Sequence, residues 1–494
     1  MRLSLVGHDY KYAAEQMMLT LFPTERPLYG EEVGPSSLSA QISLSHGGRY
    51  STAVTKFYYG GNCYRGVARA QSPDREDSLL RDRTMQKIIK LSFYRAVHTA
   101  TGKRPHWGAL TGIRPGKLAS SLIEAGHSPA RVQNILESQY YVSPQRAALC
   151  MDTAKAALTA KAGLHPARDV CLYVGIPFCP TRCAYCSFVS NAVERSMHLV
   201  EPFLSALYRE IEATAEVVRG LGLRVRALYI GGGTPTTLSA EQLGRLTGEL
   251  RRQFNLSHLT EYTVEAGRPD TVDFEKLTIL RQAGVNRISI NPQSMAHHVL
   301  EAMGRNHSPE DILRAMEEVR RVDFPSVNMD IIAGLPADCP DGFFKTLDQV
   351  LQFQAENITV HTLSLKKGSK IMTESPALPT EEAVGEMLDG AMPALRRGGY
   401  VPYYLYRQKF IAGGFENVGW CKPGRESLYN IAIMEELVSI LSLGGGGSTK
   451  LAAPKTGRIQ RIFNAKYPYE YLKGIDTILQ SKGEIEAFYQ REVF

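Results

Sequence analysis

The sequence lacks long hydrophobic runs: no stretch approaches the ~18–20 consecutive apolar residues that a membrane-spanning helix requires. It also lacks a strong charge of one sign, because 57 Lys and Arg residues against 50 Asp and Glu residues leave a net charge of +7 over 494 residues. A surplus this small does not favour binding to nucleic acid, although it is compatible with an anionic small substrate. We therefore expect no membrane span and no nucleic-acid partner.

Cysteine is scarce, with eight residues, and is unevenly distributed. Three of the eight fall between positions 179 and 186, whereas the others are scattered. A secreted disulfide framework would spread and pair its cysteines, so one tight cluster indicates a metal site in a reducing compartment. The first residues of the sequence also become polar too early for a secretory signal. We therefore expect a cytoplasmic protein.

The clearest organisation lies between residues 170 and 370, where apolar strand-like runs alternate with amphipathic segments. This alternation predicts a parallel sheet of α/β class, because a strand–helix–strand unit joins parallel neighbours. Since six such units are visible, we predict a partial (β/α)6 barrel. The predicted strands are Cys171–Phe178, Ala227–Ile230, Tyr262–Glu265, Arg287–Ile290, Val327–Ile332 and Ile358–Leu365. The predicted helices are Glu201–Arg219, Ala240–Phe254, Asp273–Ala283, Pro309–Val322 and Asp341–Phe353.

Residues 1–165 have a different pattern. Strand-like sequence with glycine-rich turns covers Gln41–Ala70, and helical sequence then runs from Asp77 to about Ala162. We predict an α+β extension domain, whose role the sequence does not indicate. Within it, Leu118–Glu137 could form two helices joined at a glycine, which we interpret as packing helices rather than as a DNA-binding motif.

The most informative segment is the loop that follows the first predicted strand of the core. It has the spacing C-x3-C-x2-C, formed by Cys179, Cys183 and Cys186. Three thiolates in one loop can ligate three irons of a [4Fe–4S] cube and leave the fourth iron open. A structural zinc site would normally have four protein ligands, and no histidine stands at zinc-finger spacing nearby. The spacing therefore favours an iron–sulfur cluster with one iron available to an exogenous ligand.

The spacing of these cysteines, together with Tyr185 just before the last of them, resembles that of the radical S-adenosylmethionine (SAM) superfamily. The resemblance implies a [4Fe–4S] cluster whose open iron binds the amino and carboxylate groups of SAM. It also implies that one electron from the reduced cluster cleaves SAM to methionine and a 5′-deoxyadenosyl radical, and that a donor such as a flavodoxin or a ferredoxin supplies that electron. In such chemistry the cofactors carry the reaction, and the protein binds and orients them.

Further motifs resemble those of the oxygen-independent coproporphyrinogen III oxidases, which convert two propionates of coproporphyrinogen III to vinyl groups and yield protoporphyrinogen IX. The segments HWGALTGIRP at 106–115 and PYYLYRQ at 402–408 are similar to the HemZ branch of that family, so the resemblance covers nearly the whole chain. The motifs of the core are, in chain order, YVGIPFC at 173–179, GGGTP at 231–235, TVEA at 263–266, GVNRIS at 284–289 and NMDIIAGLP at 328–336.

The resemblance also assigns SAM-binding positions. Gly232, Gly233 and Thr234 would hold the methionine end of SAM, since glycines at a strand end let the backbone approach a ligand closely. The same run could be only a flexible turn. Glu265, at the end of the third predicted strand, would hydrogen-bond a cationic or hydroxyl group of SAM, or could be a solvated acid at a strand end.

Five further positions are carried over from the family in the same way, for one or two SAM molecules. Asp330 could accept hydrogen bonds from the ribose hydroxyl groups, and Arg305 could pair with a carboxylate. Tyr173 and Tyr185 flank the cysteine loop and would pack on SAM and the cluster, unless they are core aromatics. Gln293 completes the set.

Residues 371–494 predict a separate α/β substrate lobe or cap. Between positions 400 and 473, ten Lys and Arg residues stand against five Asp and Glu residues, among several tyrosines. Such a composition suits the binding of a flat tetrapyrrole with propionates. The alternative is that the tyrosines belong to a strand whose alternate side chains enter a core. The run Gly444–Gly447 is the one low-complexity tract of the sequence. Two histidines, His106 and His361 on the sixth predicted strand, could contact the tetrapyrrole or act as acids, although a lone histidine is more often just a hydrogen-bonding residue.

One position departs from the oxidases, because Phe188 stands two places after Cys186, where they carry a fourth cysteine. This feature is more similar to the heme-chaperone (HemW-like) relatives.

Three hypotheses for the function follow from the sequence. The one we favour, because both extensions resemble the HemZ branch, is oxidative decarboxylation of coproporphyrinogen III in anaerobic heme biosynthesis. The second is binding and delivery of heme, and the third is radical SAM chemistry on heme itself.

Overall fold

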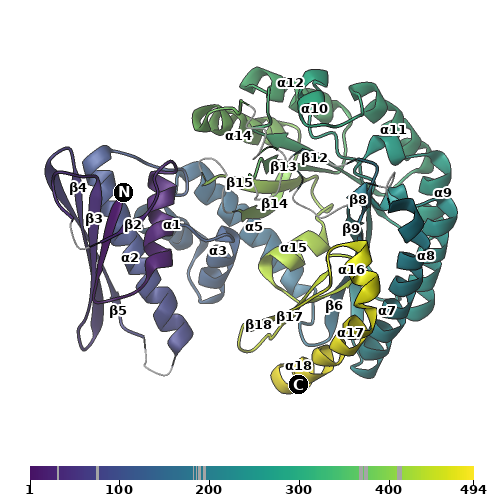
Figure 1. The fold of residues 1–494 in the computed structure, drawn as a ribbon, viewed down its shortest axis with the longest axis horizontal. Coiled ribbons are helices and arrows are strands. Elements are labelled where there is room, and N and C mark those ends of the chain that lie inside the picture. The colour runs from purple at the N-terminus through teal and green to yellow at the C-terminus, as the bar shows by residue number, and fades with distance from the viewer. Residues whose placement is uncertain are drawn as a thin grey trace. The chain divides into compact units, whose positions relative to one another are not determined.

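The chain forms two compact units, one made of residues 1–151 and 407–415 and the other of residues 152–406 and 416–494 (Figure 1). The structure is a computed structural model that describes residues 1–30, 33–73, 77–181, 183–184, 186, 191–192, 196–365, 371, 377–408 and 414–494. The domain boundaries expected near residues 165 and 370 stay a prediction. None of the helices among these residues is both long and apolar enough to cross a membrane.

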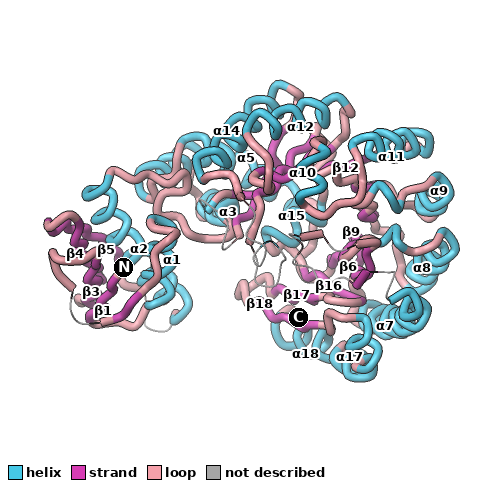
Figure 2. Tube along the Cα trace, turned by 45° about the horizontal axis from the view of Figure 1, so that its top comes forward, coloured by secondary structure: helices cyan, strands magenta, loops and turns pink. Residues whose placement is uncertain are grey.

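The larger unit is built on a sheet that has eleven strands within the described residues (Figure 2). The six strands predicted for the core are confirmed, and they lie side by side in chain order and parallel to one another. Most residues of β6 and β12 are buried, which explains why these strands are apolar runs in the sequence. They are β6 (Asp169–Ile176), β9 (Arg224–Gly232), β10 (Glu261–Glu265), β11 (Arg287–Ser289), β12 (Ser326–Ala333) and β13 (Asn357–Thr362).

The helices that connect these strands form an outer layer around them (Figures 1 and 2). Capping boxes at Ser239 and Ser308 start two of them, and the second buries one apolar stripe at helical spacing: Ile312, Ala315, Met316 and Val319. The predicted amphipathic segments are thus confirmed. The helices of this layer are α7 (Val200–Gly220), α8 (Ala240–Gln253), α9 (Phe274–Gln282), α10 (His297–Ala302), α11 (Pro309–Val322), α12 (Pro340–Gln352) and α14 (Glu381–Arg397), with 3₁₀ turns at Met197–Leu199, Pro235–Thr237 and Pro269–Thr271.

The C-terminal residues extend the same sheet at both of its ends. β14 (Val401–Arg407) and β15 (Glu416–Cys421) lie beyond β13, and β15 runs antiparallel to it. At the other end, β16 (Ser439–Gly444) is a further parallel strand, paired with β6. The remaining elements are β17 (Ser448–Ala452), β18 (Ile459–Phe463), α15 (Leu428–Glu435), α16 (Pro468–Lys473), α17 (Ile475–Ser481), α18 (Gly483–Glu492) and the short pair β7 (Phe178–Cys179) and β8 (Asn191–Ala192).

The low-complexity run Gly444–Gly447 begins at the last residue of β16 and is closely packed. A methyl group on Gly444 would lie 2.3 Å from the carbonyl oxygen of Gly175, and one on Gly445 would lie 2.6 Å from the Pro177 side chain. These glycines therefore let the C-terminal strand pack directly against the segment that leads into the cysteine loop.

The smaller unit is an α+β domain, as predicted. Its described residues form a sheet in the order β2-β1-β3-β4-β5, and alternate residues of its long strands are buried against helices. The first strand and the first helix had not been predicted. The elements are β1 (Arg2–Val6), α1 (Lys11–Leu21), β2 (Leu28–Tyr29), β3 (Ser39–His46), β4 (Tyr50–Tyr59), β5 (Asn62–Gln71), α2 (Ser78–Thr101), α3 (Pro115–Glu124), α4 (Pro129–Asn134), a π-helical turn (Ile135–Gln139) and α5 (Pro144–Ala162), which continues into the larger unit.

Candidate functional site

Two groups of polar side chains stand in a row across the parallel strands of the larger unit. The hydroxyl group of Tyr229 on β9 donates to Oε1 of Glu265 on β10 at 2.6 Å. On β12 and β13, Oδ2 of Asp330 lies 3.6 Å from Nε2 of His361, and Nδ2 of Asn328 donates to Oδ1 of Asp330 at 2.8 Å. Because neighbouring strands carry these groups, the sheet itself fixes their spacing.

Burial and charge pairing set the protonation of this row. Burial raises the pKa of Glu265 to about 7, although the hydrogen bond from Tyr229 acts in the opposite direction. Burial also acts to raise the pKa of Asp330 and to lower that of His361. The hydrogen bond and the attraction between the two outweigh burial, so the pKa of Asp330 is lowered and that of His361 is raised. The row thus pairs Asp330 with His361, whereas burial favours the neutral form of Glu265.

Tyr173 lies in a stack of tyrosines beside this row. Its ring centroid is 6.2 Å from that of Tyr229 and 6.3 Å from that of Tyr429, and the latter two are 4.5 Å apart. Each pair is stacked, an arrangement typical of aromatic core packing. The ring of Tyr173 therefore packs on two other tyrosines, and its contact with SAM stays a proposal.

The glycine run at the end of β9 packs tightly on the segment that leads into the cysteine loop. A methyl group on Gly233 would lie 2.4 Å from the carbonyl oxygen of Phe178, and one on Gly232 would lie 3.0 Å from the backbone nitrogen of Ile176. Gly232 also has a φ of +112°, which L side chains rarely adopt. The structure thus gives these glycines a packing reason that applies before any ligand binds.

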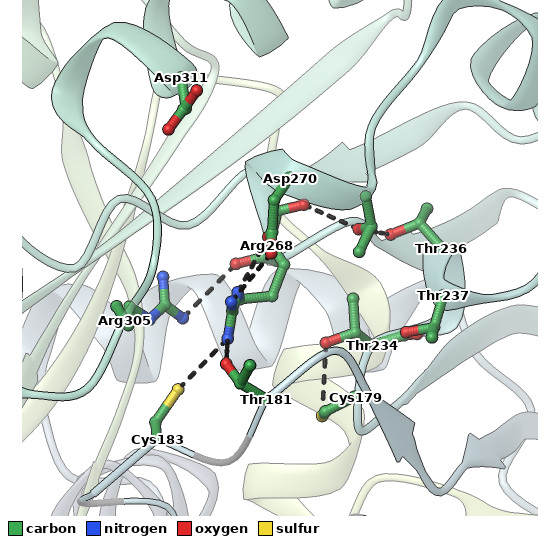
Figure 3. A network of polar contacts seen from close by, with 12 residues as sticks. Cys179, Thr181, Cys183, Thr234, Thr236, Thr237, Arg268, Asp270, Arg305 and Asp311 are labelled. Atoms are coloured by element: carbon green, nitrogen blue, oxygen red, sulfur yellow. Dashed lines mark hydrogen bonds and ion pairs between the residues drawn. The ribbon is translucent and has the colours of Figure 1, made fainter. Parts of the chain in front are cut away.

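The cysteine loop lies against this glycine run. Oγ1 of Thr234 is 3.5 Å from Sγ of Cys179 and donates to it (Figure 3), while the backbone N–H of Cys186 donates to the carbonyl oxygen of Cys183 at 3.1 Å. Cys179 is buried and the other two cysteines are partly exposed. No three His, Cys, Asp or Glu side chains of the described part of the chain are gathered closely enough to hold a metal ion. The ligand role of the three cysteines therefore stays a proposal.

Gln293 and Arg305 lie in the same region. Gln293 has a φ of +65°, and backbone hydrogen bonds to Asp330 and from Ile332 hold it there. Among the described residues its buried Oε1 has no hydrogen-bond partner. The guanidinium of Arg305, which is 7% exposed, donates to the carbonyl oxygen of Asn291 at 2.7 Å and to that of Gly267 at 3.5 Å (Figure 3). The predicted positions Tyr185 and Phe188 lie outside the described residues.

The donor set and its surroundings fit a cluster and SAM. Soft thiols come from one loop at the carboxyl end of β6, and the glycine run assigned to SAM lies directly against that loop. The unpartnered oxygen of Gln293 offers an acceptor to a ligand. The sequence analysis assigned no role to Tyr229, Asn328 or Arg268, although Asn328 begins the motif at 328–336. A polar side chain near the end of a predicted strand, as at Tyr229, or shortly after it, as at Arg268, was the signal that could have found two of them.

The comparison with known families gives the class: this is a radical SAM protein. Residues 173–350 match the family model described as the radical SAM superfamily. The structure is similar to that of coproporphyrinogen III oxidase (HemN) from Escherichia coli, with a TM-score of 0.52, 24% identity, and coverage of 66% of this chain and 72% of that chain. This similarity supports the fold alone.

The sequence comparisons place the chain more narrowly. It is 38% identical over 391 residues to the oxygen-independent coproporphyrinogen-III oxidase-like protein HemZ of Bacillus subtilis (strain 168), covering 78% of both chains. It is 27% identical to the heme chaperone HemW of Escherichia coli (strain K12), over 64% of this chain and 78% of that protein. It is 36% identical to the oxygen-independent coproporphyrinogen III oxidase of Pseudomonas aeruginosa, over 40% of this chain and 42% of that protein. The chain belongs to the family of oxygen-independent coproporphyrinogen III oxidase-like proteins.

Proposed function

We propose that the protein is an enzyme that oxidatively decarboxylates two propionates of coproporphyrinogen III to vinyl groups, giving protoporphyrinogen IX in anaerobic heme biosynthesis. The observation that carries the proposal is the similarity to HemZ, which covers 78% of the chain and therefore extends beyond the superfamily core at 173–350. An oxidase of this name from Pseudomonas aeruginosa is also 36% identical over a shorter range.

In this proposal the chain's own residues bind and orient the cofactors. Cys179, Cys183 and Cys186 hold a [4Fe–4S] cluster, while the backbone of the glycine run and the hydroxyl group of Thr234 hold the methionine end of SAM. Cluster and SAM, when bound, supply one-electron chemistry and abstraction of a hydrogen atom from the propionate β-carbon. A small electron carrier such as a flavodoxin or a ferredoxin supplies the electron that cleaves each SAM. After the hydrogen atom is removed, loss of CO2 and of one electron to a separate electron acceptor completes each vinyl group.

The strand-borne row would complete the cofactor site. A cationic group of SAM placed next to Glu265 would favour the ionised carboxylate, because an opposite charge lowers the pKa that burial has raised. Asp330 is held ionised by His361 and so can accept ribose hydroxyl groups. The free oxygen of Gln293 would accept one more hydrogen bond from the ligand.

A second candidate function is the binding and delivery of heme. The similarity to the heme chaperones HemW of Escherichia coli, at 27% identity, and of Bacillus subtilis, at 31%, favours it. So does the residue Phe188, which takes the place of the fourth cysteine of the oxidases. In this alternative the tetrapyrrole is heme, and the protein releases the heme without altering it chemically.

One anaerobic experiment separates the hypotheses. The protein with its iron–sulfur cluster reconstituted is incubated with SAM, a strong reductant and coproporphyrinogen III, and tetrapyrroles and 5′-deoxyadenosine are followed by mass spectrometry. Two successive decarboxylations coupled to SAM cleavage are the expected result. SAM cleavage with unchanged coproporphyrinogen would overturn the proposal. Stoichiometric heme binding without turnover would then support delivery, whereas consumption of heme with SAM would indicate chemistry on heme itself.

A further inference from the structure

Arg268 reaches from the end of one strand into the cysteine loop. It follows β10 by three residues and is 3% exposed. Its Nη1 donates to Oγ1 of Thr181 at 3.0 Å and lies 3.8 Å from Sγ of Cys183. Its Nε and Nη2 each donate at 3.0 Å to one carboxylate oxygen of Asp270. Figure 3 shows the guanidinium between Asp270 on one side and Thr181 and Cys183 on the other.

The backbone around Arg268 is held on both sides, so the guanidinium is aimed by the fold. Oγ1 of Thr271 donates to the carbonyl oxygen of Arg268 at 2.8 Å, and Nζ of Lys276 donates to the carbonyl oxygen of Thr271 at 3.1 Å. On the other side, Arg305 donates to the carbonyl oxygen of Gly267. The bidentate pair with Asp270 then fixes the plane of the guanidinium itself.

The surroundings of Arg268 are charged, and its own contacts lie on two sides of the guanidinium. The buried guanidinium of Arg305 lies close by, where it donates to the carbonyl oxygen of Gly267. Burial, and then the positive charges of Arg305 and Arg268, lower the pKa of the neighbouring His307 to about 4, while the charges of Asp270 and Asp311 act in the opposite direction. A buried cation needs partners: Asp270 occupies one side of the Arg268 guanidinium, and Sγ of Cys183 lies 3.8 Å from Nη1 on the other.

We propose that Arg268 is a positioning residue for the cluster: it fixes the cysteine loop through Thr181 and donates to the Cys183 thiolate, and so raises the reduction potential of the cluster. The inference depends on the proposed three-cysteine cluster and not on the identity of the tetrapyrrole. Reduction adds one negative charge to the cluster, and a cationic donor at a ligand sulfur stabilises the reduced form more than the oxidised form.

The test compares reduction potentials in the reconstituted full chain. Arg268→Gln removes the charge, and Arg268→Lys keeps a charge but cannot serve Asp270 and the loop together. Arg252→Gln is the matched control, because that arginine is 66% exposed and pairs with Glu249 on α8. Iron content and an anaerobic redox titration followed by electron paramagnetic resonance are measured for each protein, without any tetrapyrrole present.

We expect Arg268→Gln to lower the ratio of reduced to oxidised cluster at a fixed potential by about tenfold, or ~59 mV for one electron. Arg268→Lys should fall between this variant and the wild type, and the control should match the wild type. Normal iron content with an unchanged potential in Arg268→Gln would overturn the inference. If that variant takes up no iron, Arg268→Lys decides: iron uptake with a lowered potential supports the inference, and a wild-type potential or no uptake overturns it. Absence of iron in the wild type would instead overturn the three-cysteine site.

Discussion

The two sides of the candidate site are held in different ways. On the strand side, Glu265, Asp330 and His361 stand on β10, β12 and β13, and the register of the sheet sets their distances. On the loop side, the described hydrogen bonds of the cysteine sulfurs come from single side chains, those of Thr234 and Arg268, which belong to other segments. The strand side is therefore preorganised by backbone pairing, whereas on the loop side individual side chains contact the cysteine sulfurs. Substitutions should affect folding on the first side and cofactor properties on the second.

The largest effect is expected on the loop side, from Cys183→Ala. Removing one of three thiolate ligands should abolish iron uptake almost completely, because only three protein ligands are proposed. Iron content and the visible absorption of the reconstituted protein measure this. Cys339→Ala is the control, since Cys339 is exposed and immediately precedes α12 rather than lying in the loop. Equal iron content in both variants would contradict the three-cysteine site.

On the strand side, Glu265→Gln should change how stability depends on pH. The folded pKa of Glu265 is about 7 against an ordinary value of 4.5. The folded state thus keeps a proton that the unfolded state loses, and wild-type stability falls as pH rises between these values. The difference corresponds to on the order of 3 kcal/mol. Urea denaturation should show that the free energy of unfolding falls less between about pH 4 and about pH 8 in the variant than in the wild type. Parallel plots of unfolding free energy against pH for the two proteins would contradict the raised pKa of Glu265.

The strand side and the loop side differ in how much of their structure could be predicted from the sequence. The six parallel strands could be predicted because each is a short apolar run, and the side chains at their ends then share one edge of the sheet. The strand β16 could not, because its pairing with β6 joins segments far apart in the chain and rests on close contacts at glycines such as Gly444.

The partners of the cysteine loop were harder to predict for the same reason. Arg268 and Cys183 are separated by 85 positions, and nothing in the local pattern of either segment indicates that they meet. The glycine run was predicted as a site of close approach to a ligand, which stays a prediction; the structure shows that the backbones of Ile176 and Phe178 lie close to it. Spacing within a motif is visible in a sequence, whereas contacts between motifs depend on the three-dimensional fold.

Gly233→Ala tests the junction between the two sides. The added methyl group would lie 2.4 Å from the carbonyl oxygen of Phe178, so one of the two backbones must move. Overpacking of this kind typically costs about 1–3 kcal/mol. Gly248→Ala is the matched control: a methyl group added there, in α8, would have no neighbouring atom of the described residues within 4 Å, and a helical glycine replaced by alanine should stabilise by about 0.5–1 kcal/mol. Urea midpoints that shift equally would contradict the close packing at Gly233.

The smallest effect is expected for His361→Gln. This substitution tests whether the strand side keeps its geometry when the histidine that pairs with Asp330 is replaced by a neutral side chain. The pair with Asp330 raises the pKa of His361, so its contribution to stability is fully present below the ordinary histidine pKa of about 6.5 and is lost as pH rises through the raised value. The variant should therefore lose on the order of 1 kcal/mol at about pH 5.5 and less at about pH 9. A loss that is the same at both pH values would show that shape, and not the ion pair, accounts for the role of His361. Because glutamine can still donate to Asp330, iron uptake should remain at the wild-type level, in contrast to Cys183→Ala.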